Sequence, residues 1–223
     1  GMLTVNHRPQ WLVIAGGSQQ YVRALIQPYR QRIRLRCPVQ AVTRTRDAVT
    51  VRSPGSEPER FDQVVFATHS DQALALLTDA SEQERSILGA LPYQQNEVVL
   101  HTDTTLLPRA PLAWASWNYH RLPEFQGHVA MTYNMNLLQN LQARRTFCIT
   151  LNRTPAIDPR AILRTMTYHH PVYTVPGIAA QRRYASINGV NRTYYCGAYW
   201  GNGFHEDGVN SALAVGQRFG KGL

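Results

Sequence analysis

The chain has 223 residues, of which 43% are hydrophobic and 17% are charged, and its formal net charge is +9. Such a length corresponds to one or two domains, and the apolar content is too high for an intrinsically disordered protein. No apolar run approaches the roughly 20 residues that a membrane-spanning helix needs. The three cysteines lack the spacing of a metal or redox site, so we expect reduced thiols and a cytoplasmic location.

The positive charge is concentrated at the start of the chain. Residues 1–46 contain eight arginines and no acidic residue, whereas residues 47–223 carry 15 basic and 14 acidic residues. This segment could bind nucleic acid or another polyanion, or it could face a phosphate-bearing cofactor or another part of a longer protein. Its arginines lack the interleaved aromatic residues of a single-strand-binding groove, which favours the second interpretation and argues against a nucleic acid partner.

The first part of the chain alternates short strands with one helix. Apolar runs and alternating patterns bounded by glycine, proline and aspartate predict these elements, and Ser18 is a good N-cap for the helix. The predicted elements are a strand (11–14), a helix (19–31), a strand (33–36), a hairpin (38–45 and 48–52) and a strand (61–68). Pro28 should kink or shorten the helix. The last strand is continuously apolar, so we expect cover on both of its faces.

The central part begins with two short helices, which we place at residues 71–77 and 81–88. Ser81 and Glu84 have the spacing of a capping box at the start of the second helix. Alternating or apolar patterns then predict strands at residues 97–102, 113–119, 128–136 and 147–151.

The next segment is predicted to return to helix. Asp158 and Pro159 predict a helix that continues to about residue 169, because proline is favoured at the first helical position. A shorter helix is expected at residues 178–186.

The end of the chain carries the most specific local pattern. An apolar strand at residues 192–198 runs into a glycine-rich loop, and a helix starts at Asp207 or Gly208. Unpaired amides near Gly208 and Val209 would point ahead of the helix, toward the edge of a flavin ring or a phosphate. An ordinary strand–loop–helix connection that uses glycine for its turns explains the same pattern equally well.

The order of elements predicts an α/β (α+β) chain in which a sheet domain is inserted into a layered α/β domain. We place the first part at residues 2–69, the inserted domain with its mixed β-sheet and flanking helices at residues 70–190, and the return at residues 191–223. Chains that leave a nucleotide-binding domain and return to it have this layout.

Several of these segments resemble the carboxy-terminal part of flavin-containing amine oxidoreductases. Three features occur in the same order as in that family: Gly16-Gly17 before a helix and Ile33-Arg34-Leu35, Pro38-Val39 before a hairpin and residues 61–68, and residues 197–216. Four shorter stretches are similar to bacterial proteins described as predicted NAD/FAD-binding or FAD-dependent amine-oxidase-like: 67–71, 100–103, 114–119 and 203–208.

The resemblance implies FAD as the cofactor and places residues around it. The residue matching Val39 contacts adenine through its backbone, those matching Ala67 and Thr68 lie near the ribose and diphosphate, and those matching Gly208 and Val209 meet the pyrimidine side of the flavin. We add three residues of the glycine-rich connection to this site: Gly197, Ala198 and Asp207.

The resemblance also implies a larger enzyme. The family carries a Rossmann-type Gly-x-Gly-x-x-Gly motif at its amino terminus, and this sequence lacks it. We therefore expect a fragment, or a shortened reading frame, that is inactive alone and holds FAD weakly or not at all. Surfaces exposed by such truncation could support a homo-oligomer.

Two departures from the family bear on the substrate. The family often places a lysine near the reactive flavin nitrogen, and the first lysine here is Lys221; the family's aromatic residue before the last helix is matched by Gly208. A desaturase or dehydrogenase that acts on a small molecule, apolar or lipid-like, fits better than an amine oxidase. Trp117, Tyr133 and Trp200 are candidates for its pocket, and sheet core explains them equally well.

Other functions receive less support from the residues. No histidine or acidic cluster has a recognised ligand spacing, so no metal site is predicted, and no residue is assigned as catalytic acid or base. The alternative function is a basic module that binds nucleic acid or anionic lipid headgroups through residues 8–46.

Overall fold

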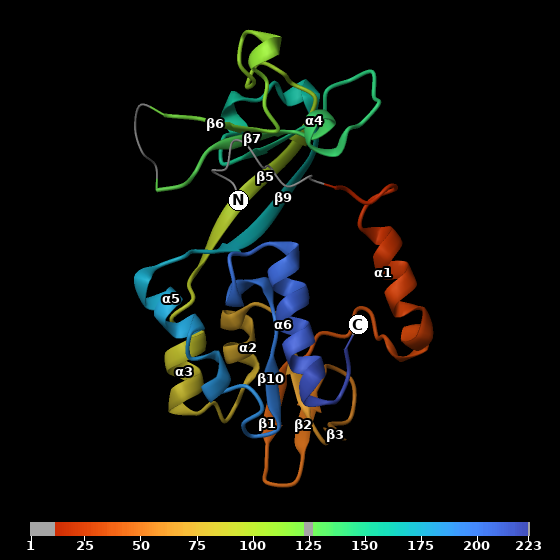
Figure 1. Ribbon diagram of the computed structural model, residues 1–223, viewed down its shortest axis with the longest axis vertical. Helices are drawn as coiled ribbons and strands as arrows, with labels where there is room; N and C mark the ends of the chain where they lie inside the picture. The colour runs from red at the N-terminus through yellow and green to blue at the C-terminus, as the bar shows by residue number, and fades with distance from the viewer. Residues whose placement is uncertain (1–11, 123–126, 223) are drawn as a thin grey trace.

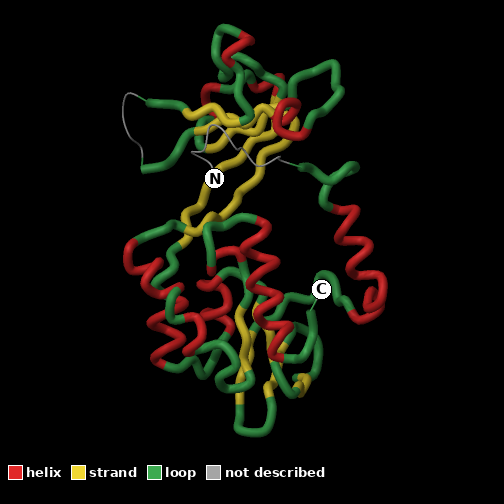
Figure 2. Tube along the Cα trace, in the orientation of Figure 1, coloured by secondary structure: helices red, strands yellow, loops and turns green. Residues whose placement is uncertain are grey.

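The computed structural model describes residues 12–122 and 127–222 of the chain. They form two bodies along the long axis of the molecule (Figure 1). We call residues 38–91 and 172–219 the α/β body, and the described part of residues 92–171 the sheet body. Helices gather in the α/β body, and the strands of the sheet body rise from it as a separate layer (Figure 2). The expected α/β fold with an inserted sheet is therefore present.

Two small sheets lie in the α/β body. Strands β1 (Ala41–Arg44), β2 (Val49–Arg52) and β3 (Glu59–Phe61) form an antiparallel sheet, and its first pair is the predicted hairpin. Strand β4 (Val64–Phe66) pairs in parallel with β10 (Thr193–Tyr195). This pairing joins the first and last parts of the chain in one body, as the predicted layout requires.

Three helices cover these sheets: α2 (Ser70–Leu76), α3 (Glu82–Leu88) and α5 (Val175–Gln181). Their apolar side chains share one buried core with the strands. Its members are Val42, Val49, Phe66, Ala73, Leu77, Ile87, Leu88, Ala180, Ile187 and Tyr195. The helices at both edges of the predicted insert thus pack onto the flanking parts, while the domain limits at 69/70 and 190/191 stay a prediction.

The sheet body consists of five antiparallel strands in the order β6-β7-β8-β5-β9. Their bounds are β5 (Tyr93–His101), β6 (Trp117–Tyr119), β7 (Met131–Asn134), β8 (Cys148–Leu151) and β9 (Ile162–Pro171). A short helix, α4 (Met135–Gln139), follows β7, and 3-10 turns lie at Pro111–Ala113 and Thr154–Ala156. The four predicted strands of this region are confirmed, with shorter or shifted ends.

The helix predicted over residues 158–169 is wrong. Only Pro159–Ala161 form a single 3-10 turn, and the chain then continues as β9, the edge strand beside β5. Thr165 and Thr167 are β-branched and favour a strand, and β9 pairs with β5 along nearly its whole length. The preference of proline for the start of a helix was therefore weaker than the pairing with a long neighbouring strand.

The start of the chain also differs from expectation. Helix α1 (Gln19–Ile26) continues as a 3-10 segment (Gln27–Arg32) with a kink after Pro28, as predicted, but none of its residues is buried. Residues 33–36 form no strand, and neither do residues 12–14; Trp11 lies outside the described residues. No described strand pairs with these segments, so their apolar pattern alone does not make them strands.

The expectation that residues 61–68 are covered on both faces is wrong as well. Strand β4 is only three residues long and belongs to a two-stranded sheet. Phe66 points into the core, whereas Val65 keeps 45% of its surface exposed. One face of β4 is therefore an open apolar surface in this structure.

The last helix, α6 (His205–Arg218), follows β10 after a 3-10 turn at Ala198–Trp200. It begins two residues earlier than the earlier of the two predicted starts. Across residues 12–122 and 127–222, none of the helices combines the length and the apolar character required to cross a bilayer.

Candidate cofactor site

The carboxyl ends of β4 and β10 form the centre of the candidate site. Because the two strands run parallel, Ala67 and Thr68 after β4 emerge at the same sheet edge as Gly197 and Ala198 after β10. Ligands of open α/β sheets bind beyond this edge. Four of the predicted cofactor residues are therefore neighbours, although two segments far apart in the sequence supply them.

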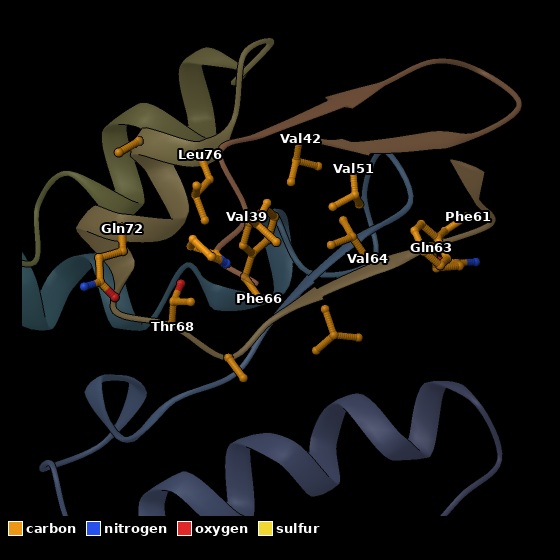
Figure 3. Close-up of a pocket in the computed structure, with 14 residues that line it drawn as sticks. Val39, Val42, Val51, Phe61, Gln63, Val64, Phe66, Thr68, Gln72 and Leu76 are labelled. Atoms are coloured by element: carbon orange, nitrogen blue, oxygen red, sulfur yellow. The ribbon is translucent and has the colours of Figure 1, made fainter. Parts of the chain in front are cut away.

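A cavity of about 730 Å³ opens beside β4. Figure 3 shows its walls, which come from the hairpin, from β4 and from α2. The lining is almost entirely apolar: Pro38, Val39, Val42, Val51, Phe61, Gln63, Val64, Val65, Phe66, Ala67, Thr68, Gln72, Ala75 and Leu76. Three predicted cofactor residues, Val39, Ala67 and Thr68, lie in this one cavity. An apolar cleft with few polar groups suits a flat aromatic ring such as adenine.

Local hydrogen bonds fix the entrance of the cavity. The Gln40 amide donates to the Arg52 carbonyl at 2.8 Å, which holds the chain next to Val39 against the hairpin. The Thr68 hydroxyl donates to the His69 carbonyl at 3.2 Å, and the His69 amide donates to Gln72 Oε1 at 3.3 Å. The turn from β4 into α2 is thereby closed, so Thr68 and Gln72 lie on the same wall.

The connection from β10 to α6 has a strict requirement for glycine. A Cβ at Gly197 would lie 2.5 Å from the ring of Tyr199, so a side chain at this position would displace that ring. The Gly197 amide donates to Ser211 Oγ at 2.8 Å and thereby ties the strand end to the helix. The absence of a side chain at Gly197 therefore lets the Tyr199 ring pack against the backbone.

The start of α6 differs from the sequence-based expectation. The helix begins at His205, so the Gly208 amide is already paired, and it donates to the Phe204 carbonyl at 3.2 Å. The free amides of the first turn belong to earlier residues. The Asp207 carboxylate lies over this end and accepts bonds from the Asn202 and Phe204 amides at 3.0 and 2.9 Å.

This carboxylate decides which ligand the helix start can take. Glu206 and Asp207 both lie in the first turn and already balance the positive end of the helix dipole. A phosphate here would meet two like charges. The uncharged, polar edge of a flavin ring fits the helix start better.

The three predicted substrate-pocket residues do not come together. Trp117 and Tyr133 face each other across β6 and β7 in the sheet body, with ring centroids 6.5 Å apart. Trp200 instead packs in the α/β body, 5.0 Å from the ring of Tyr199 and 4.8 Å from that of Tyr184. Its environment is that of a core residue.

Sequence reasoning missed an aromatic group at the junction of the two bodies. The His69 ring stacks on Tyr93 with a centroid distance of 4.3 Å, and the Tyr93 hydroxyl accepts a bond from the Ser70 amide. Tyr173 lies close to Gly203, where an added Cβ would meet its hydroxyl at 2.6 Å. Burial, then the charges of Asp207 and Tyr93, raise the pKa of Tyr173. Gly203 was the feature of the sequence that could have indicated this close contact with Tyr173.

Part of the basic segment is used inside the protein. The Arg44 side chain is buried and bonds to Glu84 at 2.9 Å and to Asp79 at 3.2 Å, and Arg34 pairs with Glu59. Arg44 therefore cannot contact an external polyanion. This finding weakens the alternative of a nucleic-acid or lipid-binding module.

The cysteines and the possible metal ligands form no further site among the described residues. All three cysteines are free, and burial is the main cause that raises the pKa of Cys148 to about 11. Among the described residues, no group of three or more histidine, cysteine, aspartate or glutamate side chains is arranged to hold a metal ion.

The family is shown by the sequence profile of flavin containing amine oxidoreductases, which matches residues 2–125, more than half of the chain. The chain therefore belongs to the flavin-containing amine oxidoreductase family. No curated protein matches the chain at a significant level.

Solved structures share the fold at low sequence identity. A CLA-producing fatty acid isomerase from P. acnes is 16% identical (TM-score 0.58) and matches over 82% of this chain and 47% of its own. Cyclohexylamine oxidase from Brevibacterium oxydans IH-35A is 14% identical (TM-score 0.58), over 92% and 53%. Putrescine oxidase is 12% identical (TM-score 0.59), over 92% and 52%. The chain spans about half the length of these structures.

Proposed function

We propose that this chain is the carboxy-terminal portion of an FAD-dependent oxidoreductase, an amine-oxidase-like dehydrogenase or desaturase. The observation that carries the proposal is the apolar cavity at the carboxyl end of β4, which gathers Val39, Ala67 and Thr68. FAD, when bound, would supply the chemistry, because it accepts a hydride from a substrate carbon. The chain's own residues position the cofactor and the substrate.

The residues present fit the two ends of such a cofactor. The apolar walls of the cavity suit the adenine ring, and the exposed Thr68 hydroxyl at its rim suits the ribose. The start of α6 lies at the same sheet edge, behind Gly197 and Ala198, and suits the polar edge of the flavin. Because Asp207 opposes a phosphate there, we expect the diphosphate to need donors beyond those of this chain, so that FAD binding is weak.

The sheet body is the proposed substrate side. Cross-strand register places Trp117, Tyr133, Ile149 and Leu100 in one row on one face of the sheet. A row of apolar and aromatic side chains favours an apolar or lipid-like small molecule. The cytoplasmic location, the absence of a nucleic acid partner and a homo-oligomer stay predictions.

A titration tests the cavity directly. Quenching of flavin fluorescence measures the binding of FAD, which we expect to be weak but saturable. ADP should compete with FAD, because it has the same adenine end. Ala67→Phe places a ring inside the cavity, so both ligands should bind at least about tenfold more weakly, a loss of about 1.4 kcal/mol.

The matched control is Ala185→Phe, the same substitution at an exposed alanine outside the cavity. Circular dichroism and a thermal melt establish that both variants fold. FAD binding that Ala67→Phe leaves unchanged, in a folded variant, would contradict the assignment of the cavity.

A further inference from the structure

A chain of hydrogen bonds crosses the interior of the sheet body. His101 Nε2 lies 2.7 Å from Thr150 Oγ1, which lies 2.7 Å from Thr132 Oγ1, which lies 2.8 Å from His120 Nε2. His101, Thr150 and Thr132 are completely buried, whereas His120 is half-buried. The four side chains connect β5, β8, β7 and the residue after β6.

One backbone hydrogen bond determines which atom donates at each step of this row of hydrogen bonds. The Asp103 amide donates to His101 Nδ1 at 3.2 Å, so Nδ1 must be the unprotonated nitrogen. Neutral His101 therefore carries its proton on Nε2 and donates to Thr150, which leaves the Thr150 hydroxyl to donate to Thr132 and the Thr132 hydroxyl to donate to His120. His120 Nε2 accepts, and the proton of neutral His120 is on Nδ1.

The surroundings of both histidines favour the neutral form. Burial lowers the pKa of His101, and burial followed by the nearby charge of Arg153 lowers the pKa of His120. The Nδ1 donor of His120 has no hydrogen-bond partner among the described residues. The row of hydrogen bonds thus sets the protonated nitrogen of His120, which is half-buried.

His120 lines a cavity of about 450 Å³ in the sheet body. Its lining has two arginines, Arg109 and Arg153, and no acidic residue: Thr105, Leu106, Leu107, Pro108, Arg109, Asn118, Tyr119, His120, Arg153 and Ala156. Neither arginine forms an ion pair within the part of the chain that the structure describes. Among the described residues, the cavity therefore gathers positive charge without a carboxylate to balance it.

We propose that this cavity binds an oxyanion, the carboxylate or phosphate group of a small molecule, between Arg109, Arg153 and His120. A guanidinium offers several N–H donors in a plane that matches such a group, and a neutral imidazole adds one more. The anion would satisfy the His120 donor and relieve the unfavourable proximity of Arg153 to His120.

The oxyanion cavity shares no lining residue with the proposed cofactor cavity, and it is also separate from the aromatic row of the proposed substrate side. Asn118, Thr132, Thr150 and Val99 form one cross-strand row, and the adjacent row contains Trp117, Tyr133, Ile149 and Leu100. Successive residues of a strand point to opposite faces, so the oxyanion cavity lies on the face away from the aromatic row. Its test does not depend on FAD.

The first experiment is isothermal titration of the chain with inorganic phosphate and, separately, with butyrate, at constant ionic strength set with chloride. We expect saturable binding that Arg109→Gln and Arg153→Gln each weaken about tenfold or more, as for a lost charge-assisted bond. Preference for phosphate or for butyrate identifies the chemical source of the anion.

The matched control is Arg164→Gln, which removes the same charge from an exposed position of β9. It should leave binding unchanged. Absence of saturable binding by both probes, or equal weakening by Arg164→Gln, would overturn the proposal.

A second measurement tests the donor itself. Long-range ¹H–¹⁵N spectra of the histidine rings should show the Nδ1–H form of His120 and the Nε2–H form of His101, and the anion should shift only the His120 Nδ1 signal. The Nε2–H form at His120, or an unchanged Nδ1 signal at saturation, would overturn this role.

Discussion

A buried charged group holds the α/β body together at the residue scale. Glu84 accepts a bond from the Tyr195 hydroxyl at 2.6 Å and from Arg44 at 2.9 Å, and the Arg44 guanidinium also reaches Thr193 at 3.2 Å. These residues come from α3, β1 and β10. The group therefore links the first part of the chain to its return.

Removing one charge from this group should be costly. In Glu84→Gln the Arg44 charge remains buried, and the more exposed Asp79 is the one charged partner left to it among the described residues, so we expect a loss of about 3 kcal/mol in the free energy of unfolding. Urea unfolding measures this loss. The matched control Glu57→Gln, in an exposed turn, should stay within about 0.5 kcal/mol of the wild type. Equal effects of the two substitutions would refute the argument.

The same carboxylate predicts how stability depends on pH. Burial acts to raise the pKa of Glu84, but the bonds from Arg44 and Tyr195 outweigh it and lower the pKa to about 2. A lowered carboxyl pKa stabilises the fold above the unfolded-state pKa, near 4.3, and this contribution is lost as the pH falls toward 2. The urea midpoint of the wild type should fall over this range. The midpoint of Glu84→Gln should fall less, and parallel curves would argue against the assignment.

Local signals and long-range pairing compete at the scale of single elements. The start of α3 follows its local signal: Ser81 Oγ accepts from the Glu84 amide at 3.2 Å, and Glu84 Oε2 accepts from the Ser81 amide at 2.8 Å. The segment that becomes β9 follows the opposite course, because nine of its ten residues pair with β5. The local preference for a short helix was weaker than this pairing.

The cap of α3 can be tested separately. Ser81→Ala removes the acceptor of the Glu84 amide and the hydroxyl bond to Glu84 Oε2 at 2.9 Å, so we expect a loss of about 1 kcal/mol or slightly more. Thermal unfolding followed by circular dichroism measures it. Ser56→Ala, in an exposed turn, is the control and should change the melting temperature little. Equal melting temperatures for the two variants would show that the cap contributes nothing.

The whole molecule is uneven in how well its parts are packed. The α/β body has a continuous core, whereas α1 and the 3-10 segment after it have no buried residue. Helix α1 lies at the side of the molecule (Figure 1), where Tyr21 makes an edge-on ring contact with His205 at a centroid distance of 6.4 Å. Elements with few buried contacts open at low cost in free energy.

Limited proteolysis should detect this difference. Trypsin should cut first after the exposed arginines of residues 23–36, whereas Arg44 should resist, because it is buried and paired. Mass spectrometry of short digests identifies the first cuts. First cleavage within residues 44–90 would contradict the packing described here.

The sequence by itself determined the features that depend on neighbouring residues. The hairpin of β1 and β2, the cap at Ser81, the kink after Pro28 and the glycine at position 197 follow from turn chemistry, capping and sterics that act within a few residues. The family resemblance, which the profile match over residues 2–125 confirms, rests on the same kind of local pattern.

Only the tertiary structure decided what depends on residues far apart in the chain. The parallel pairing of β4 with β10 creates the sheet edge of the candidate cofactor site. Trp200 packs against Tyr184 in the α/β body and so does not join the aromatic row of the sheet. The row from His101 to His120 crosses four segments. Such contacts arise only when a long loop closes and the burial of apolar surface offsets its entropy, and this balance belongs to the whole fold rather than to any local pattern.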